Sequence, residues 1–442
     1  DLQKEAKIPL ITSIDQEGGL VERTIKLDQK IEYLTPMALC ATKDIEITRK
    51  HTSIMAQDLL NLGINMDFAP VLDVNTNQHN PIIGIRSFSN NADEVITHSK
   101  AVINELQLNN IIPVGKHFPG HGEAWVDSHL EMPVIDLEKQ ELEETHIKPF
   151  KQAVQNGLDA IMVAHVHYTA FDKDEIPASL SKNVITQYLR KELGFDGLII
   201  SDDMVMGGIA NSFSKVDAII KGINAGINLF IFRDSYSTTL KSIDMLVSAI
   251  EKEAINVDQI NESVLRILKI KEKYGILEQN APVYPEINIS DCQKEIDFMA
   301  TKSITVVKSG KELPLDKTKK YCILTPNKSQ IFNYSFDKGF LSQFLDGLQR
   351  EELIYSLNPD NDEIQQLLKS LETFDAVIFV SYNALFNQNQ ISLFNSIQKP
   401  VIAISAGIPY DSEFYNRADS ILHSYCYKTP SLKALASVMI NP

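Results

Sequence analysis

Six short apolar runs, separated by longer stretches of helical character, constrain the fold of this chain more than any other feature. All six precede residue 235 and are rich in β-branched residues. They are IPLITSI (8–14), INMDFAPVLDV (64–74), IIPVGKH (111–117), DAIMVAHV (159–166), GLIISDD (197–203) and AGINLFIFRD (225–234). Because short apolar strands that alternate with helices are typical of parallel βα units, the sequence predicts an α/β fold.

Each run ends in a polar or ionisable residue, and this placement indicates where a site would lie. These residues are Asp15, Asp73, Lys116 with His117, His165, Asp202 and Arg233. In a parallel βα barrel, the active site is assembled from the C-terminal ends of several strands. An open doubly wound sheet would instead gather functional residues at one switch point. The pattern therefore favours a (β/α)8 TIM-type barrel.

The domain organisation follows from the same pattern. A closed barrel of this kind needs eight strands, so we expect two further βα units, about 60 residues, upstream of Asp1. An amphipathic helix over 257–277 would end a first, barrel domain at 1–277, followed by a linker at 278–295. Residues 296–442 should form an αβα sandwich domain, with strands near 303–308, 320–326, 374–382 and 399–407.

Composition excludes several classes of partner. The formal net charge of −16 argues against a nucleic-acid partner, and no apolar run approaches the length of a membrane-spanning helix. The four cysteines lie far apart and form no CxxC pair, so neither a zinc ribbon nor a disulfide framework is indicated. We expect no cofactor, and a small polar molecule remains the best candidate partner.

The segment KHFPGHGEAWVDSH (116–129) admits three interpretations, namely a metal site, a catalytic device or a solvated loop. Pro119 and Gly120 prevent His117 and His121 from sharing a helical face, as the histidines of a zinc-binding HExxH motif do. Asp127 and His129, two residues apart, favour catalysis, because a carboxylate bonded to an imidazole orients the ring and favours its protonated form. We therefore expect no metal here, and His129 becomes a candidate general acid.

Other residues of this segment have more modest expected roles. Gly120 and Gly122 would permit a hinge movement of the loop, whereas His121 and Trp125 are expected to serve loop structure alone. Asp202, at the end of a buried run, could act as a nucleophile, although an N-cap of the following helix is an equally good interpretation. Its neighbour Asp203 should point to the opposite side of the strand.

Five motifs in succession also carry a family resemblance. They are SIDQEGGLVERT (13–24), NMDFAPVLDVN (65–75), PIIGIRSFS (81–89), KHFPGHGEAWVDSH and GLIISDDMVMGGI (197–209). Together they resemble glycoside hydrolase family 3, and within it the bacterial β-N-acetylhexosaminidases. The second part of the chain is similar to the αβα sandwich domain of many members.

The resemblance implies a retaining two-step glycosidase that releases β-linked N-acetylglucosamine from muropeptide, peptidoglycan or chitooligosaccharide fragments, as in peptidoglycan recycling. By motif, Asp202 would be the nucleophile, and Asp127 with His129 the acid/base dyad. This histidine replaces the second carboxylate of most retaining glycosidases. Asp15, Arg86, Lys116 and His117 would hold the sugar hydroxyls and the acetamido group.

Several alternatives stay open at this stage. Members with this histidine include enzymes that resemble phosphorylases, so the motif does not separate hydrolysis from phosphorolysis. A family 3 β-glucosidase is less favoured, because such members usually take an acidic acid/base from the second domain and 296–442 identifies none. A catalytically inactive sugar-binding module is the alternative outside enzymes. The resemblance leaves the compartment open between the bacterial cell envelope and the cytoplasm, and the oligomeric state undetermined.

Overall fold

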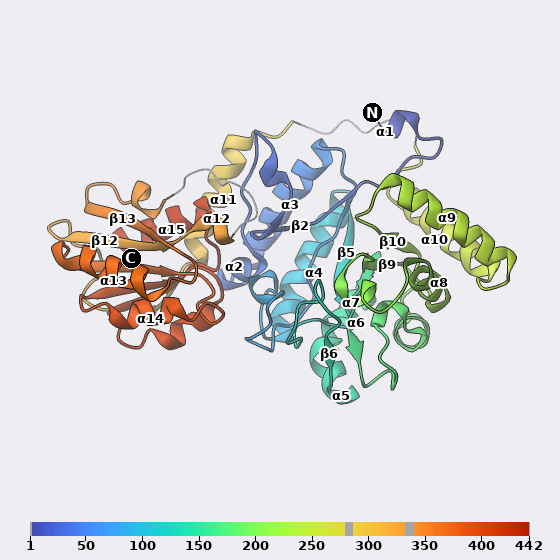
Figure 1. Ribbon diagram of the computed structural model, residues 1–442. Coiled ribbons are helices and arrows are strands. Elements are labelled where there is room, and N and C mark those ends of the chain that lie inside the picture. The colour runs from blue at the N-terminus through green and yellow to red at the C-terminus, as the bar shows by residue number, and fades with distance from the viewer. Residues whose placement is uncertain (1, 279–285, 332–339, 442) are drawn as a thin grey trace. The chain divides into compact units, whose positions relative to one another are not determined.

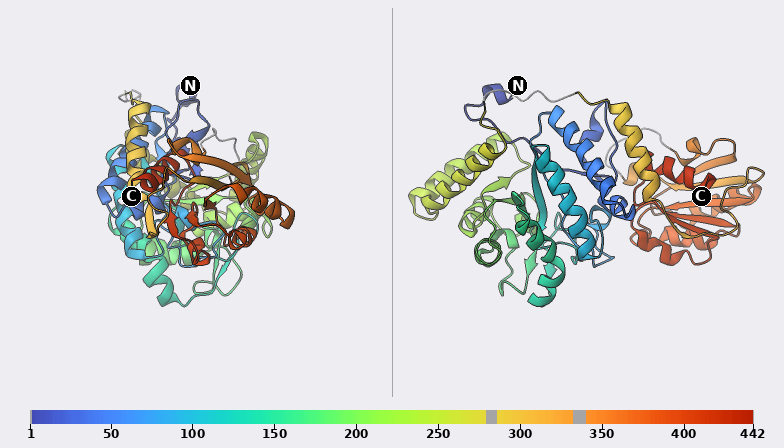
Figure 2. Two further views of the ribbon diagram at one scale, coloured as in Figure 1. Left: turned by 90° about the vertical axis from the view of Figure 1, so that its left-hand side faces the viewer. Right: turned by 180° about the vertical axis from the view of Figure 1, so that it is seen from behind.

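The computed structural model describes residues 2–278, 286–331 and 340–441 (Figure 1). The chain divides into two compact units. The first unit comprises Asp1–Glu17 and Thr48–Ile287, and the second comprises Gly18–Ile47 and Asn288–Pro442. Figure 2 gives two further views of their elements. Within the described residues, no helix combines the length and the apolar character needed to cross a membrane.

The first unit is built on a curled six-stranded parallel sheet, and its strands confirm all six predicted runs. In spatial order the strands are β1 (Ser13–Ile14), β4 (Met66–Asp67), β5 (Ile112–Phe118), β7 (Ala160–Val163), β9 (Leu198–Asp203) and β10 (Leu229–Ile231). Spatial order follows chain order, as in a barrel. Since β1 and β10 are the edges, the described strands form an open curled sheet.

Helices alternate with the strands; several pack on one face of this sheet, while the last one contributes Ile270 to the apolar cluster on the other face. They are α3 (Ile45–Asn61), α4 (Ala92–Leu108), α5 (Lys139–Glu141), α6 (Lys148–Gln155), α7 (Gly207–Ala210), α8 (Lys215–Ala225), α9 (Tyr236–Glu251) and α10 (Val257–Lys273), after a short α1 (Leu2–Glu5). Capping fixes several helix starts. The Asn91 side chain accepts hydrogen bonds from the backbone of Asp93 and Glu94 at the start of α4.

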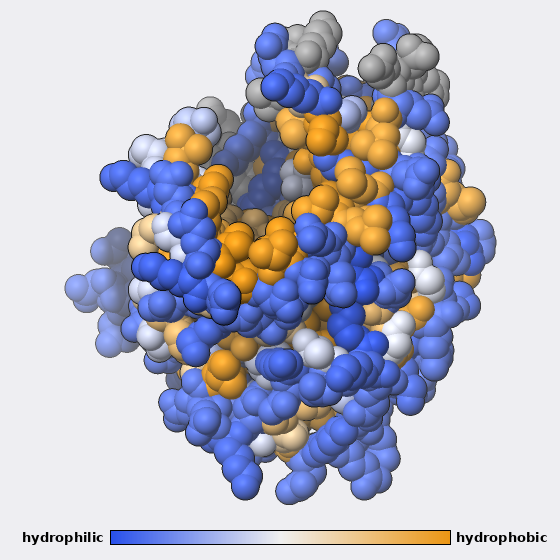
Figure 3. All heavy atoms as spheres, turned by 90° about the vertical axis from the view of Figure 1, so that its right-hand side faces the viewer, coloured by the Kyte–Doolittle hydropathy of each residue, from blue (hydrophilic) through white to orange (hydrophobic). Residues whose placement is uncertain are grey.

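The alternation of side chains along the strands separates two apolar layers. Ile161 and Ile199 pack outward in a cluster with helix residues such as Phe150. Val114 and Ile200 belong to a separate cluster on the inner face. A cavity of 290 Å³ lies beside this inner cluster, and its lining is mostly apolar but includes Ser13 of β1 and Lys271 of α10. The face seen in Figure 3 is hollowed, and apolar side chains gather around the hollow.

The second unit contains a six-stranded sheet with helices on both faces. Its spatial order is β11 (Thr305–Lys308), β16 (Ser420–His423), β15 (Val401–Ser405), β14 (Ala376–Ser381), β12 (Lys320–Pro326) and β13 (Gln349–Tyr355). All neighbours are parallel except β11 and β16. The helices are α11 (Ile289–Ser303), α12 (Lys328–Ile331), α13 (Asn361–Ser370), α14 (Asn389–Ser396) and α15 (Thr429–Ile440). This layering agrees with the predicted αβα sandwich.

Two strands of this sheet escaped the sequence analysis. β13 has the sequence QREELIY, whose charged residues suit an edge strand but not an apolar pattern. β16 has only four residues. The last part of the predicted linker at 278–295 is helical, because α11 begins at Ile289. Residues 279–285 of that linker lie outside the described residues.

Residues 18–47 pack with the second unit, whereas the predicted boundaries assign them to the first domain. This segment contains most of the short hairpin β2 (Gln16–Gly18) and β3 (Val21–Glu22), as well as α2 (Pro36–Ala41). Thr35 caps α2 through its hydroxyl and donates a hydrogen bond to the Tyr425 carbonyl, 3.0 Å away. As boundaries of independently folding domains, 1–277 and 296–442 stay a prediction.

Candidate active site

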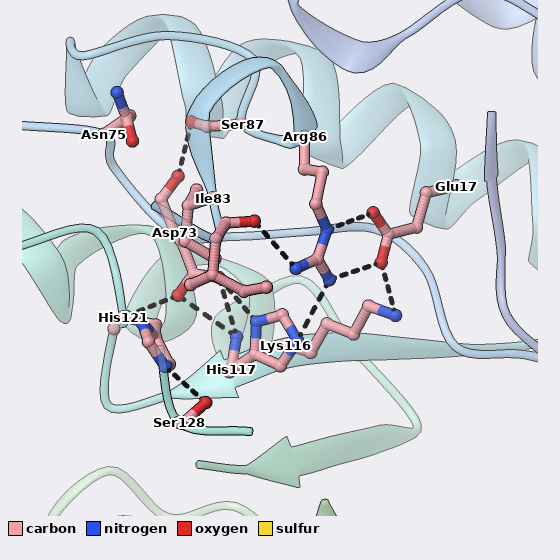
Figure 4. A network of polar contacts seen from close by, with 12 residues as sticks. Glu17, Asp73, Asn75, Ile83, Arg86, Ser87, Lys116, His117, His121 and Ser128 are labelled. Atoms are coloured by element: carbon pink, nitrogen blue, oxygen red, sulfur yellow. Dashed lines mark hydrogen bonds and ion pairs between the residues drawn. The ribbon is translucent and has the colours of Figure 1, made fainter. Parts of the chain in front are cut away.

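A buried cluster of charges occupies the carboxyl ends of β1 and β5 in the first unit. The Lys116 ammonium lies 2.6 Å from Glu17 and 2.8 Å from Asp15. Arg86, from the turn Gly84–Arg86, donates two hydrogen bonds of 2.8 Å to the same Glu17 carboxylate (Figure 4). Glu17 and Lys116 are almost fully buried, while Asp15 is partly exposed. Asp15 thus reaches solvent, while the buried charges beneath it are paired with one another.

Burial and charge act in opposite directions on these groups. Burial alone would raise the pKa of Glu17, but the Arg86 and Lys116 cations outweigh it and hold that pKa well below its usual range. Burial would likewise lower the pKa of Lys116, and Asp15 with Glu17 instead raises it. All three interactions therefore persist as charged hydrogen bonds around neutral pH.

Asp73 organises the neighbouring histidines. Its carboxylate lies 2.7 Å from His117 Nδ1 and accepts a 2.6 Å hydrogen bond from the His121 backbone N–H. Arg86 Nη2 lies 3.4 Å from His117 Nε2, which joins this part to the cluster around Glu17 (Figure 4). Burial would raise the pKa of Asp73, but His117 outweighs it and lowers that pKa. Asp73 therefore fixes the ring of His117 and the start of the following loop.

The predicted dyad is present on the loop between β5 and β6 (Val134–Ile135). Asp127 Oδ1 lies 2.8 Å from His129 Nδ1 and also accepts a 2.8 Å hydrogen bond from the His129 backbone N–H. This contact with Asp127 raises the pKa of His129 against the opposing effect of partial burial. About half of the His129 side chain remains exposed. The protonated form of His129 is thus favoured, and its ring is exposed enough for a ligand to contact it.

Backbone contacts hold this loop against the segment that follows β9. The N–H groups of Gly207 and Gly208 donate 3.0 Å hydrogen bonds to the carbonyls of His129 and Ser128. A side chain at Gly207 would place its Cβ 2.2 Å from the Leu130 carbonyl oxygen, so glycine permits the approach. The backbone of His129 is consequently hydrogen-bonded to Gly207, five residues after Asp202.

The glycines at the start of the loop serve close packing in this structure. A Cβ at Gly122 would lie 1.7 Å from the Val74 carbonyl oxygen, and one at Gly120 would lie 2.8 Å from the His146 side chain. His121 is buried and its Nε2 lies 2.9 Å from Ser128 Oγ. The hinge role expected for Gly120 and Gly122 is therefore not needed to explain them, and the loop movement stays a prediction.

Asp202 is the second-last residue of β9 and is half-buried, and its Oδ1 accepts a 2.8 Å hydrogen bond from the Asp203 N–H. Burial would raise the pKa of Asp202, but His117 and His165 outweigh it and lower that pKa. Asp203 has other partners: its carboxylate accepts hydrogen bonds from the backbone of Val205 and Arg233. The two neighbouring carboxylates thus have different partners, and Asp202 stays ionised beside His117 and His165.

The structure thus places six of the predicted residues in two groups, each joined internally by hydrogen bonds or ion pairs. Asp15, Arg86, Lys116 and His117 share one network, and Asp127 with His129 forms the dyad. No hydrogen bond between the described residues joins the His129 ring to Asp202, but the charge of Asp202 contributes to the raised pKa of His129.

Sequence reasoning missed Glu17 and the anchoring role of Asp73. Asp73 carried a usable signal, because it follows a strand, whereas nothing local distinguishes the burial of Glu17. Within the described ranges, no three His, Cys, Asp or Glu side chains are grouped to hold a metal ion.

Comparisons with known proteins show which family this chain is similar to. Residues 1–270 match the glycosyl hydrolase family 3 N terminal domain. Beta-hexosaminidase A of Pseudoalteromonas piscicida is 31% identical over 353 residues, which are 75% of this chain and 59% of that protein. A beta-hexosaminidase of Haemophilus influenzae is 36% identical over 248 residues, or 55% of this chain and 70% of its own length.

A solved structure matches almost the whole chain. A glycoside hydrolase family 3 beta-N-acetylglucosaminidase from Paenibacillus sp. superposes with a TM-score of 0.92 at 31% identity, over 99% of this chain and 86% of that one. The present chain spans 59% of the length of the Pseudoalteromonas relative, so that relative contains further sequence.

Proposed function

The chain belongs to glycosyl hydrolase family 3, and on that premise we propose that it is a retaining β-N-acetylhexosaminidase. Its substrates would be β-linked N-acetylglucosaminides from muropeptide, peptidoglycan or chitooligosaccharide fragments. One observation carries the proposal: the Asp127–His129 dyad is hydrogen-bonded through its backbone to the segment that follows Asp202. The proton donor His129 and the ionised carboxylate Asp202 thereby lie on two backbone segments that are hydrogen-bonded to each other.

In the first step, an Asp202 oxygen attacks the anomeric carbon while the bond to the leaving-group oxygen breaks. His129 gives its proton to that oxygen through Nε2, because Nδ1 is held by Asp127. Asp127 stabilises the imidazolium beforehand, as its raising effect on the pKa of His129 indicates. The product of this step is a glycosyl-enzyme and a neutral His129.

In the second step, neutral His129 takes a proton from water as the water oxygen attacks the anomeric carbon. The bond to Asp202 breaks, its carboxylate is restored, and N-acetylglucosamine leaves with retained configuration. The low pKa of Asp202 suits both steps, since the group must be ionised to attack and must leave as an anion. Histidine suits the acid role beside an anionic fragment, because it lacks the repulsion of a second carboxylate.

Recognition of the sugar is assigned to the network around Glu17. Partly exposed Asp15 is suited to accept hydrogen bonds from sugar hydroxyls, and Lys116, Arg86 and His117 are suited to donate to hydroxyls or to the acetamido carbonyl. Glu17 and Asp73 hold these donors in place. Such preorganised charges cost no rearrangement when the substrate binds.

The acid role of His129 is tested by the choice of leaving group. His129→Ala should slow turnover far more with a poor leaving group, such as an unsubstituted disaccharide, than with a nitrophenyl glycoside, which needs little protonation. Equal losses on both substrates would remove His129 from the acid role. Asp202→Ala should abolish turnover of both and supplies the control.

The same assay separates the remaining alternatives. Release of nitrophenol from the β-N-acetylglucosaminide but not from the β-glucoside supports the proposed specificity. Addition of inorganic phosphate should leave free N-acetylglucosamine as the product, whereas a sugar 1-phosphate would make the protein a phosphorylase. A folded protein without activity on any aryl glycoside would favour the sugar-binding alternative.

A further inference from the structure

An exposed aromatic ring lies on the same loop as the acid/base dyad. Trp125 is the single tryptophan of the 442 residues, and 65% of its surface is exposed. Loop structure alone does not explain this exposure, because a large apolar side chain gains free energy only where its surface is removed from water. An exposed tryptophan two residues before Asp127 is therefore a candidate contact for a ligand at the dyad.

The indole is held in one orientation by His79. The two rings are stacked, with centroids 5.8 Å apart and an interplanar angle of 12°. The backbones behind the two rings are also joined, since Asn77 Nδ2 donates a 3.1 Å hydrogen bond to the Ala124 carbonyl and Asn77 Oδ1 accepts one of 2.9 Å from the His79 N–H. His79 thus lies alongside the indole, while 65% of the tryptophan surface stays open to solvent.

The position of the ring specifies what it would meet. Cα atoms two residues apart are at most about 7 Å apart, so Trp125 lies beside Asp127 and close to His129. If His129 protonates the leaving-group oxygen, as the proposed function requires, the group bonded to that oxygen must lie next to this loop. The part of the substrate near Trp125 is therefore the leaving group and not the sugar held by Lys116 and Arg86.

We propose that the Trp125 indole, backed by His79, is a stacking platform for a pyranose ring in the leaving-group position. The apolar C–H face of a pyranose packs on a flat aromatic surface, while its hydroxyls remain in water at the edge. The platform would select leaving groups that begin with a sugar ring over those that lack a ring. This inference rests on the proposed function and narrows its substrates to oligosaccharides.

Kinetics on two substrates test the platform. Trp125→Ala should lower kcat/KM about tenfold on the β-1,4-linked N-acetylglucosamine disaccharide and less than twofold on the methyl β-N-acetylglucosaminide, whose leaving group has no ring. Trp125→Phe should restore part of the loss, and His79→Ala should cause a smaller loss on the disaccharide alone. Equal losses on both substrates would show that Trp125 only supports the loop and would overturn the proposal.

Leu130 provides a matched control for these variants. It lies on the same loop, is apolar and is 73% exposed. Leu130→Ala should leave kcat/KM on both substrates unchanged within twofold, because its side chain is not stacked in the platform. A loss on the disaccharide as large as that of Trp125→Ala would mean that general exposure of this loop, and not the indole, recognises the leaving group.

Fluorescence gives a readout that does not depend on turnover. Since Trp125 is the single tryptophan, its emission in an Asp202→Asn variant should change on titration with the disaccharide and stay constant with N-acetylglucosamine alone. A change with neither sugar, although the disaccharide binds by calorimetry, would overturn the proposal. If the wild-type protein turns over neither substrate, the proposed function fails, and this titration still decides whether Trp125 contacts the second sugar.

Discussion

Two buried glutamates five residues apart, Glu17 in the first unit and Glu22 in the second, have opposite electrostatic states. Glu17 receives hydrogen bonds from Arg86 and Lys116, and its pKa lies well below the usual range. Burial raises the pKa of Glu22 to about 7, although Lys428 lies 2.7 Å away and partly counteracts the shift. The same side chain, equally buried, is held charged in one place and is only about half ionised at pH 7 in the other.

The difference lies in the number of donors and in the neighbouring charges. Glu17 has two cations for one carboxylate, and both its oxygens accept hydrogen bonds. Glu22 has one cation, its Oε1 lacks a partner among the described residues, and the carboxylate of Glu32 raises its pKa further. Burial penalises a charge unless it is fully paired, so the first cluster is built to keep its charges and the second is not.

The largest effect is expected for Glu17→Gln. The amide would leave the Arg86 and Lys116 cations insufficiently paired, so the free energy of unfolding should fall by about 3 kcal/mol at pH 7. Loss of the fixed donors should lower kcat/KM on the nitrophenyl N-acetylglucosaminide at least about 100-fold. Glu22→Gln is the matched control, and its kcat/KM should stay within about twofold of wild type. Equal losses of kcat/KM in both variants would mean that the charge of Glu17 matters no more to activity than that of Glu22.

Stability as a function of pH should separate the two glutamates next. The folded-state pKa of Glu22 is raised above its ordinary value, so protonated Glu22 is favoured in the folded protein. Its protonation therefore stabilises the fold at low pH, and this contribution is lost as pH rises from about 4.5 to about 7. Glu22→Gln removes that loss. The variant should match wild type at pH 5 and exceed it at pH 8, by at most about 3 kcal/mol, in urea denaturation.

For Glu17 the sign is opposite. Its folded-state pKa is depressed, so its contribution is present above the ordinary glutamate range and is lost only as pH falls below it. Wild type and Glu17→Gln should therefore converge in stability in strong acid and separate at neutral pH. A Glu22→Gln variant less stable than wild type at pH 8 would mean that the Lys428 pair is a net stabilising contact.

A smaller effect is expected for Arg86→Lys. Lysine keeps the charge but replaces two parallel hydrogen bonds to Glu17 by one. We expect a loss of about 1 kcal/mol in the free energy of unfolding and about tenfold in kcat/KM. Lys319→Arg, at a Lys319–Glu312 pair in the second unit, is a control that should change neither quantity. An unchanged kcat/KM in Arg86→Lys would show that charge alone is needed at Glu17.

The sequence predicted the strands of the first unit, because each strand carries a continuous apolar run with a polar residue at its end. Asp202 and Lys116 were selected in this way, and His129 was selected by its spacing to Asp127, so all three signals are local. Glu17 could not be found from a local signal, because its burial depends on Arg86 and Lys116, which are 69 and 99 residues away in the chain. Pairing of this kind is set by tertiary structure, which no local pattern reports.

The same reason explains the errors in the second unit. The segment around Glu22 follows the first strand directly and was assigned to the first domain, but it packs with residues that include Lys428. β13 was missed because an edge strand tolerates the charges of QREELIY. Where packing partners are distant, apolar periodicity weakens, and both boundaries and burial become hard to predict.

The smallest expected effect tests whether Glu32 helps to keep Glu22 near neutral. The carboxylate of Glu32 raises the pKa of Glu22, and it also accepts 3.2 and 3.3 Å hydrogen bonds from the N–H and hydroxyl of Thr429. Glu32→Gln removes the negative charge and keeps one acceptor. In this variant the decline of stability with rising pH should therefore end at a lower pH, while stability at pH 5 should fall by only about 0.5 kcal/mol.

Glu312→Gln is the control, because the carboxylate of Glu312 does not act on Glu22. This variant should leave the pH of the decline unchanged. A decline at the wild-type pH in Glu32→Gln would mean that burial and the unpartnered oxygen alone account for the state of Glu22, and the number of cations around each carboxylate would then suffice to explain how the two glutamates differ.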